Sequence, residues 1–154
     1  MPLPLRPPLH RAAGARSVRV LIVEDEPLIA WMLADCLEGA GHEVLGPAGT
    51  MADALALCEA AAAPGLAVLD IGLRDGSSGA ELARALLVRW GVRSIFASAQ
   101  TEDARRARDA ALGCVRKPYA PETVLRCVEM AREVMGGGTP GHVPPGFELF
   151  PAAE

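Results

Sequence analysis

Val20-Leu-Ile-Val-Glu-Asp-Glu-Pro27 is the segment that decides the fold, because an apolar run passes directly into three carboxylates and a proline. An unbroken apolar run of this length is typical of a strand buried on both faces of a parallel sheet. Pro27 is tolerated at the first position of a helix, and the apolar residues after it recur at helical spacing as far as Gly39. We therefore predict a strand over 18–23 followed by a helix from Pro27.

The same alternation of short apolar segments and helical stretches continues along the chain, which indicates a parallel sheet covered on both faces. Charged residues between 99 and 113 leave mainly alanines for a buried face, so the fourth helix should be short or irregular. The other strands are predicted at 44–45, 66–69, 95–97 and 114–115, and the other helices from the cap Thr50 to residue 61, from the capping box Ser78-Gly-Ala-Glu81 to Trp90, and from Pro121 to Met135.

The composition is that of one domain, because 154 residues with 51% hydrophobic content suffice for one buried core. We expect a flexible tail over 1–16, the domain over 17–135, and a Gly/Pro-rich tail over 136–154. The net charge of −4 argues against nucleic acid and anionic membranes as partners. Neither a secretory signal nor a membrane-spanning run is present, and the four scattered cysteines lack CxxC spacing, so a cytoplasmic protein with reduced thiols is expected.

The predicted C-terminal tail contains two of the chain's six aromatic residues, Phe147 and Phe150. One interpretation is a disordered end, and the other is an arm that docks on the domain or on a second subunit.

Polar residues follow the predicted strands at their carboxyl ends, where ligands bind in open parallel α/β sheets. Glu24 and Asp25 follow the first strand, Asp70 the third, Ser98 the fourth and Lys117 the fifth. Taken singly, such residues are more often helix caps, turn residues or solvated charges. Together at one sheet edge, the carboxylates would repel one another unless a cation compensated them, and Mg²⁺ prefers such oxygen ligands. This combination points to phosphoryl transfer.

Lys117 is the only lysine, because the other fourteen basic residues are arginines. If all basic positions were equivalent, chance would leave the single lysine there roughly one time in fifteen. A compact ammonium reaches a carboxylate and a phosphoryl oxygen without the bulk of a guanidinium.

From about Val18 to Met135 the chain resembles the receiver domains of bacterial response regulators. The matching segments are Val20-Leu-Ile-Val-Glu-Asp-Glu-Pro27, Ala67-Val-Leu-Asp-Ile71, Ile95-Phe-Ala-Ser-Ala99 and Val115-Arg-Lys-Pro118. The resemblance implies an α/β fold, a flavodoxin-like doubly wound sheet of five parallel strands in the order 2-1-3-4-5 with five helices.

The resemblance also implies that Asp70 attacks the phosphohistidine of a sensor histidine kinase or histidine phosphotransfer protein, or a small phosphodonor. Glu24, Asp25, Asp70 and the backbone carbonyl of Gly72 would hold Mg²⁺, with Mn²⁺ as the alternative metal. Lys117 would pair with Asp70 and then with a phosphoryl oxygen.

Two further roles follow from the resemblance. The bond from Lys117 to Pro118 would be cis, as the family usually makes it. Ser98 would turn its hydroxyl onto the phosphoryl group and move the loop after the fourth strand.

Several positions depart from the family pattern. Arg74 replaces the usual proline after the acceptor, and Cys114 replaces the switch aromatic three residues before the lysine, for which Tyr119 is the candidate substitute. The stretch between Ser98 and the lysine is also shorter than usual. Phe96-Ala-Ser98 is similar to the Phe-Ala-Thr strand of an alphaproteobacterial receiver subgroup found beside atypical sensor kinases.

Only nineteen residues follow Met135, fewer than a DNA-binding or enzymatic output domain needs. We therefore expect a stand-alone signalling phosphoacceptor that catalyses only its own phosphorylation and dephosphorylation. It would pass its phosphoryl group onward in a phosphorelay, drain a kinase, or bind a downstream protein target when phosphorylated, and a homodimer is a candidate assembly. The alternatives are a phosphorylation-independent interaction module and a flavodoxin-like cofactor binder. The Glu-Asp-Glu loop, where a phosphate cradle needs Gly, Ser or Thr, argues against the cofactor binder.

Overall fold

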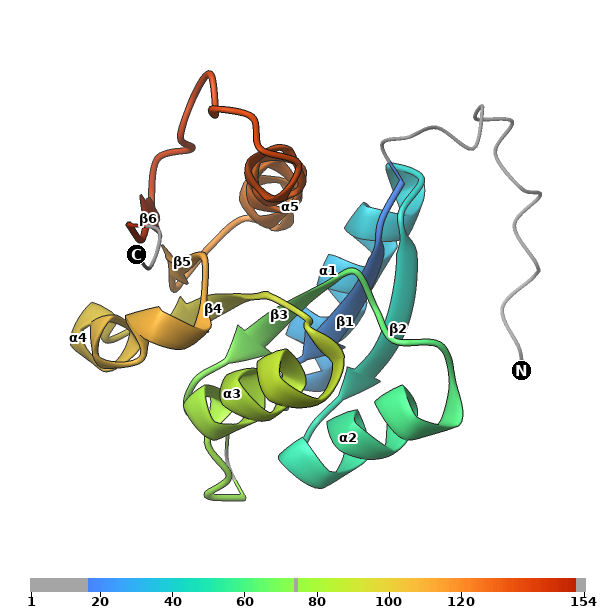
Figure 1. Ribbon diagram of the computed structural model, residues 1–154. Helices are drawn as coiled ribbons and strands as arrows, with labels where there is room; N and C mark the ends of the chain where they lie inside the picture. The colour runs from blue at the N-terminus through green and yellow to red at the C-terminus, as the bar shows by residue number, and fades with distance from the viewer. Residues whose placement is uncertain (1–16, 74, 152–154) are drawn as a thin grey trace.

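The computed structural model describes residues 17–73 and 75–151, so the predicted flexible tail over 1–16 and Arg74 lie outside the described residues. Six strands form one sheet in the order β2-β1-β3-β4-β5-β6 (Figure 1). The first five pair in parallel, and β6 pairs antiparallel with β5. The predicted fold class and strand order 2-1-3-4-5 are therefore confirmed, with one strand added at the β5 edge.

Regular structure follows the predicted segments closely. The strands are β1 (Arg19–Val23), β2 (Glu43–Ala48), β3 (Leu66–Asp70), β4 (Ser94–Ser98), β5 (Gly113–Arg116) and β6 (Phe147–Leu149). The helices are α1 (Pro27–Gly39), α2 (Met51–Ala60), α3 (Gly79–Trp90), α4 (Thr101–Arg106), the short 3-10 helix η1 (Arg108–Ala110) and α5 (Pro121–Met135). None of these helices is long and apolar enough to span a membrane.

Local sequence signals account for the helix boundaries. The hydroxyls of Thr50 and Ser78 each accept a hydrogen bond from the backbone amide three residues further on, so both residues are N-caps. Pro27 and Pro121 occupy the first positions of α1 and α5. Gly91 ends α3 in the left-handed conformation, with φ of 69°. The four helix starts predicted from the sequence are confirmed.

The apolar core has two layers, one on each face of the sheet. Helices α1 and α5 cover one face, while α2, α3 and α4 cover the other (Figure 1). Every residue of β3 and β4 is buried, which explains why these strands read as apolar runs rather than as alternating patterns. From β1, β3, β4 and β5, the core residues of the layer toward α1 and α5 are Val20, Ile22, Leu66, Val68, Ile95, Ala97 and Val115, and those of the other layer are Leu21, Val23, Ala67, Leu69, Phe96 and Cys114.

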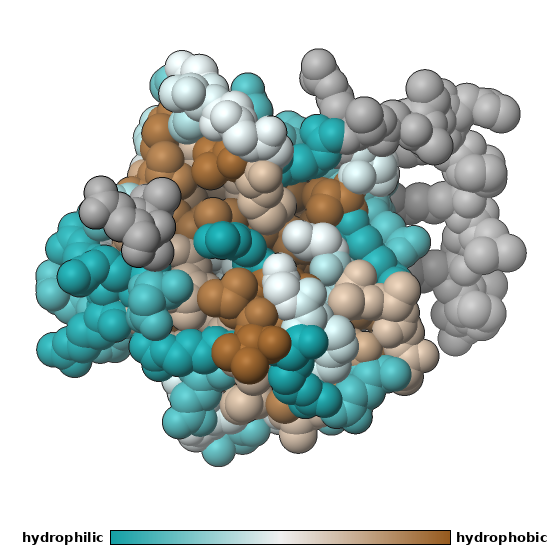
Figure 2. Space-filling view, viewed as in Figure 1, coloured by the Kyte–Doolittle hydropathy of each residue, from teal (hydrophilic) through white to brown (hydrophobic). Residues whose placement is uncertain are grey.

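The fourth helical segment is short and interrupted, as the charge-rich sequence predicts. Helix α4 is six residues long and continues into the three residues of η1. The segment packs on the core through small side chains only: Ala104, Ala107 and Ala110 are its buried residues. In the space-filling view, the surface over α4 is hydrophilic, and apolar side chains gather beside it toward α5 (Figure 2). A segment whose buried side chains are all alanines has little apolar area with which to resist movement.

The predicted Gly/Pro-rich tail over 136–154 contains one element of regular structure within its described residues, 136–151. Residues 147–149 form β6 along the free edge of β5, and the side chains of Phe147 and Phe150 are buried. Aromatic burial and a strand edge that needs partners together explain why this segment docks. Of the two interpretations of the tail, an arm that docks on the domain agrees with the structure.

Candidate functional site

The carboxyl ends of the parallel strands bring the predicted acidic residues together. Glu24 and Asp25 follow β1, and Asp70 ends β3, which pairs directly with β1. One carboxylate oxygen from each of these three residues lies within 4.8 Å of the others. Residues that are far apart in sequence therefore form one compact acidic cluster, at the sheet edge where the sequence analysis expects a site.

Lys117 follows β5 and reaches back over the sheet edge to this cluster. Its ammonium nitrogen lies 3.0 Å from Oε1 of Glu24 and 3.0 Å from Oδ2 of Asp70. Burial lowers the pKa of Lys117, but the hydrogen bonds to Asp70 and Glu24 outweigh burial and raise the pKa to about 12. The lysine is therefore a permanently charged bridge between the two carboxylates.

Glu24 is the most buried member of the cluster, with a side chain that is only 3% exposed. This burial raises the pKa of its carboxyl group, and the hydrogen bond from Lys117 partly offsets the increase. The second carboxylate oxygen accepts a hydrogen bond from the backbone amide of Glu26 at 3.1 Å. Both oxygens are thus held in fixed positions by the protein.

Asp70 is positioned by the loop that follows it. Its Oδ1 accepts a hydrogen bond from the backbone amide of Gly72 at 3.1 Å, while Oδ2 is bound by Lys117. Sequence analysis assigned Gly72 through its carbonyl as a metal ligand, and that role remains a prediction. The structure shows a further contact of this residue, because its amide orients the carboxylate of Asp70.

Gly79 is a site residue that sequence analysis used only as part of a capping box. A Cβ atom at this position would lie 2.3 Å from the carbonyl oxygen of Asp70 and 2.8 Å from the Cα of Ile71. Only glycine allows α3 to start this close to the end of β3. The signal available in the sequence is a glycine directly after a serine cap, which by itself does not reveal what lies opposite.

The cluster fits a divalent cation by charge and by ligand chemistry. Three carboxylates and one ammonium leave two negative charges, and all the candidate ligand atoms are oxygens. Mg²⁺ binds through one or two carboxylates together with water and phosphate oxygens, and Mn²⁺ accepts similar ligands. Glu24, Asp25 and Asp70 are the residues that would hold the ion.

Ser98 ends β4 at the same edge, but its hydroxyl is engaged in its own loop. The hydroxyl donates a hydrogen bond to the carbonyl oxygen of Gln100 at 2.9 Å and accepts one from the amide of Gln100 at 3.0 Å. The backbone amide of Lys117 donates to the carbonyl of Ser98 at 3.0 Å. The loop after β4 is thus linked to the lysine through the backbone.

Cys114 and Tyr119 lie on opposite faces of the sheet. Cys114 is buried in the core layer that contacts α4, whereas Tyr119 packs against the layer of α1 and α5. Burial raises the pKa of Tyr119 to about 12, so its hydroxyl stays protonated at neutral pH. Tyr119 therefore does not occupy the layer in which the predicted switch aromatic would stand.

The peptide bond from Lys117 to Pro118 is cis.

Comparisons with known proteins agree with this geometry. Residues 20–129 match the family described as response regulator receiver domain. The phyllosphere-induced regulator PhyR of Methylorubrum extorquens is 38% identical over 122 residues, which are 77% of this chain and 45% of that protein. The transcriptional regulatory protein PdtaR of Mycobacterium tuberculosis is 35% identical over 128 residues, covering 80% of this chain and 61% of that protein.

A solved structure has a similar fold. The response regulator PhyR from Brucella abortus superposes with a TM-score of 0.71 at 35% identity, over 79% of this chain and 50% of that chain. The chain thus spans roughly half the length of the PhyR proteins that it matches. Receiver domains are signalling phosphoacceptors rather than conventional enzymes, and this chain, with its family match, its sheet order and its acidic cluster, belongs to the response regulator receiver domain family.

Proposed function

We propose that Asp70 accepts a phosphoryl group from the phosphohistidine of a sensor histidine kinase or a histidine phosphotransfer protein, in a Mg²⁺-dependent reaction. The observation that carries the proposal is the convergence of Asp70, the acidic pair and the only lysine at one sheet edge. A purely structural acidic loop does not require a buried Glu24 and a lysine that bridges two strand ends.

The chemistry follows from what each group offers. A carboxylate oxygen of Asp70 attacks the phosphorus while the phosphorus–nitrogen bond of the phosphohistidine breaks, and the imidazole keeps the electron pair of that bond. Lys117, whose Nζ lies 3.0 Å from Oδ2 of Asp70, neutralises negative charge on the transferred group. A divalent cation held by Glu24, Asp25 and Asp70 supplies further neutralisation when bound. The protein contributes mainly position and charge.

The surface beside the acidic cluster supports docking of a kinase or phosphotransfer helix. Helix α1 begins directly after the acidic pair and leaves three large apolar side chains in solvent. Leu28, Trp31 and Met32 are 69%, 54% and 44% exposed. Neighbouring exposed apolar side chains of this size are typical of a protein-binding surface.

The output we propose is a protein–protein interaction or onward transfer of the phosphoryl group in a relay. Helix α4, which follows Ser98, has little apolar burial to hold it, because Ala104 is its only buried side chain. We propose that Ser98 leaves its bonds to Gln100 and binds a phosphoryl oxygen, and that the loop after β4 moves with it.

Phosphorylation with a small phosphodonor tests the acceptor assignment directly. We expect acetyl phosphate with Mg²⁺ to produce an acid-labile adduct on the wild-type chain, detected by intact-mass spectrometry, and none on Asp70→Asn. A Ser17→Ala variant, altered at an exposed residue near the other end of the sheet, should be labelled like the wild type. If no adduct forms on the wild type, or if Asp70→Asn is labelled equally, the chain is instead a phosphorylation-independent interaction module.

A further inference from the structure

β6 covers the edge of β5, which would otherwise be the free edge of the sheet. The two strands pair antiparallel over three residues, with Gly113 opposite Leu149 and Val115 opposite Phe147. Backbone hydrogen bonds extend this pairing at both ends. The amide of Arg116 donates to Gly146 at 2.8 Å, and the amide of Phe150 donates to Leu112 at 2.8 Å.

The side chains of this segment alternate between the two layers of the core. Phe147 and Leu149 belong to the layer toward α5, and Phe150 belongs to the layer toward α4. Glu148 lies between Phe147 and Leu149 in sequence and points to the α4 side, where its carboxylate accepts a hydrogen bond from Arg105. Each residue from 147 to 150 therefore makes its own contact with the receiver domain.

Gly113 provides a recess for this segment. A Cβ atom at Gly113 would lie 2.3 Å from the ring carbon Cζ of Phe147 and 2.4 Å from the carbonyl oxygen of Glu148. The backbone at Gly113 is ordinary strand, so its conformation does not demand glycine. The missing side chain is needed because an aromatic ring and a strand backbone come this close.

Glu148 is held by charge as well as by the strand pairing. Its Oε2 accepts a hydrogen bond from Nε of Arg105 at 3.0 Å and its Oε1 accepts one from Nη2 at 2.8 Å, a bidentate arrangement. The hydrogen bonds from Arg105 and the charge of Arg116 lower the pKa of Glu148. Arg105 of α4 and Arg116 of β5 thus offer two basic side chains to an acidic residue in a strand added at the β5 edge.

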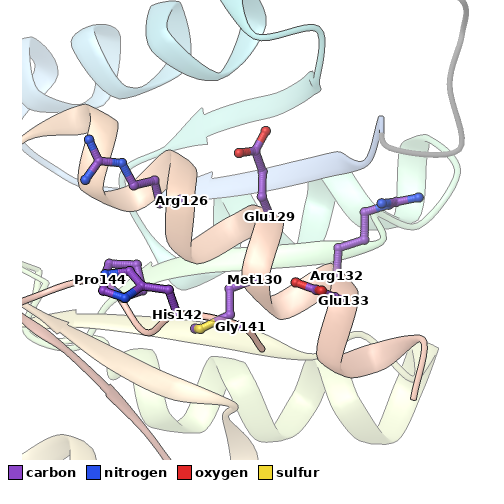
Figure 3. Close-up of a pocket in the computed structure, with 8 residues that line it drawn as sticks. All are labelled: Arg126, Glu129, Met130, Arg132, Glu133, Gly141, His142 and Pro144. Carbon is purple, nitrogen blue, oxygen red and sulfur yellow. The ribbon is translucent and has the colours of Figure 1, made fainter. Parts of the chain in front are cut away.

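The connection from α5 to β6 is loosely packed. A cavity of about 570 Å³ separates α5 from the returning chain and is lined mainly by polar side chains. In the close-up, Glu129 projects from α5 and His142 from the returning segment (Figure 3). A second cavity of about 630 Å³ lies between the end of α5 and residues 149–151. Residues 136–139 and 141–143 of this connection are exposed, and the segment is anchored from the buried Pro144 to Phe150.

We propose that residues 147–150 are an intramolecular cover, and that the β5 edge beneath them binds an extended segment of a protein partner that carries an acidic residue flanked by apolar ones. The segment present in the structure shows what the edge recognises. It needs an aromatic side chain over Gly113, an acidic side chain against Arg105, and a second apolar side chain toward α4.

Strand addition explains how a partner would replace the cover. Main-chain hydrogen bonds to β5 supply affinity, and the side chains at alternate positions supply specificity. A three-residue strand on a loosely packed connection opens more readily than the inner strands of the sheet. The tethered cover competes at an effective concentration of about 1 mM, so a partner must bind more tightly than an untethered copy of the cover.

The test uses a fluorescent peptide with the sequence of residues 144–151, Pro-Pro-Gly-Phe-Glu-Leu-Phe-Pro. It is titrated against the full chain and against the full-chain double variant Phe147→Ala, Phe150→Ala. We expect the double variant, whose cover is weakened, to bind the peptide at least about tenfold more tightly than the wild type. Equal binding to both chains, or no binding to a folded double variant, would overturn the proposal.

Matched variants place the peptide on the β5 edge. Adding Gly113→Ala to the double variant should abolish binding, whereas adding Gly39→Ala should not, because a Cβ at Gly39 meets no atom within 4 Å. A peptide carrying Glu148→Lys should bind weakly, and Arg105→Glu in the double variant should restore its binding. Failure of this charge exchange would remove Arg105 from the site and contradict the proposal.

Hydrogen exchange on the wild-type chain keeps the proposal testable if the double variant does not fold. The amides of Arg116 and Phe150 report on the cover, and the amide of Ala67, which bonds to Arg93 at 3.0 Å, reports on the inner sheet. We expect the first two to exchange at least about tenfold faster than the third. Equal rates would mean that the segment opens only when the whole domain unfolds, and the proposal would be wrong.

The oligomeric state separates a partner from a second copy of this chain. The proposal expects a monomer by light scattering, with the cover bound to its own domain. A dimer that dissociates when the peptide is added would show that the occupant is β6 of a second copy, and it would overturn the assignment to a separate partner.

Discussion

Removing the only lysine is the most informative perturbation of the acidic cluster. The variant Lys117→Met keeps a long unbranched side chain but takes away the charge that bridges Glu24 and Asp70. At the observed 3.0 Å, and with an effective dielectric constant of about 20, each ion pair corresponds to about 5.5 kcal/mol of Coulomb attraction.

The net loss is smaller than the sum of these two terms. The cost of burying the ammonium offsets much of the attraction, and the lysine side chain is still 21% exposed to screening water. Glu24 and Asp70, at 3% and 10% exposure, nevertheless stay buried without their cation. We therefore expect Lys117→Met to lose about 2–4 kcal/mol of unfolding free energy in the absence of divalent ions.

Metal addition should reverse part of this loss. Because an ion bound only by the folded state stabilises it by mass action, saturating Mg²⁺ should raise the stability of Lys117→Met more than that of the wild type. Urea unfolding at neutral pH, followed by circular dichroism in EDTA and in Mg²⁺, measures both effects. Arg126→Met, at an exposed position of α5, is the control and should change stability little. Wild-type stability of Lys117→Met in EDTA would refute the electrostatic reasoning.

Three further predictions concern the cap, the acceptor strand and the cover. Ser78→Ala removes the N-cap of α3 and should cost about 1 kcal/mol in urea unfolding. Gly79→Ala puts a Cβ 2.3 Å from the carbonyl oxygen of Asp70, so phosphorylation by acetyl phosphate should slow and stability should fall by about 1–3 kcal/mol. The hydrogen bond from Arg105 lowers the pKa of Glu148 in the folded chain. The contribution of this ion pair to stability is therefore fully present above the ordinary carboxyl pKa and is lost as the pH falls through the lower folded-state pKa. NMR shifts of the β6 residues should follow this titration. An unchanged labelling rate, or β6 shifts that titrate at the ordinary pKa, would contradict the last two.

Much of the fold could be predicted from the sequence, because the signals for strands and helix starts are local. The run from Val20 into Pro27 marks a buried strand and a helix start by composition alone. Thr50 and Ser78 mark helix starts because a side-chain oxygen meets a backbone amide only three residues away. The acidic site could also be predicted from the sequence, since parallel strands place all their carboxyl ends at one edge of the sheet.

Other features of the site depended on contacts that no local pattern encodes. The sequence suggested that Lys117 would meet Asp70, but only the structure places it at equal distance from Glu24 as well. The hydroxyl of Ser98 could have faced the cluster or its own loop, and the balance of nearby backbone partners decided for the loop.

What the sequence by itself determined is therefore the order of strands and helices and the residue types at the strand ends, because periodicity, caps and parallel topology act over a few residues or follow from chain direction. The tertiary structure alone decided the fate of the C-terminal segment. Gly113 and Phe147 are more than thirty residues apart, and neither residue indicates that the other will lie against it. The strand forms because β5 has an edge to pair and Gly113 leaves room for an aromatic ring, and these conditions exist only once the sheet has been assembled.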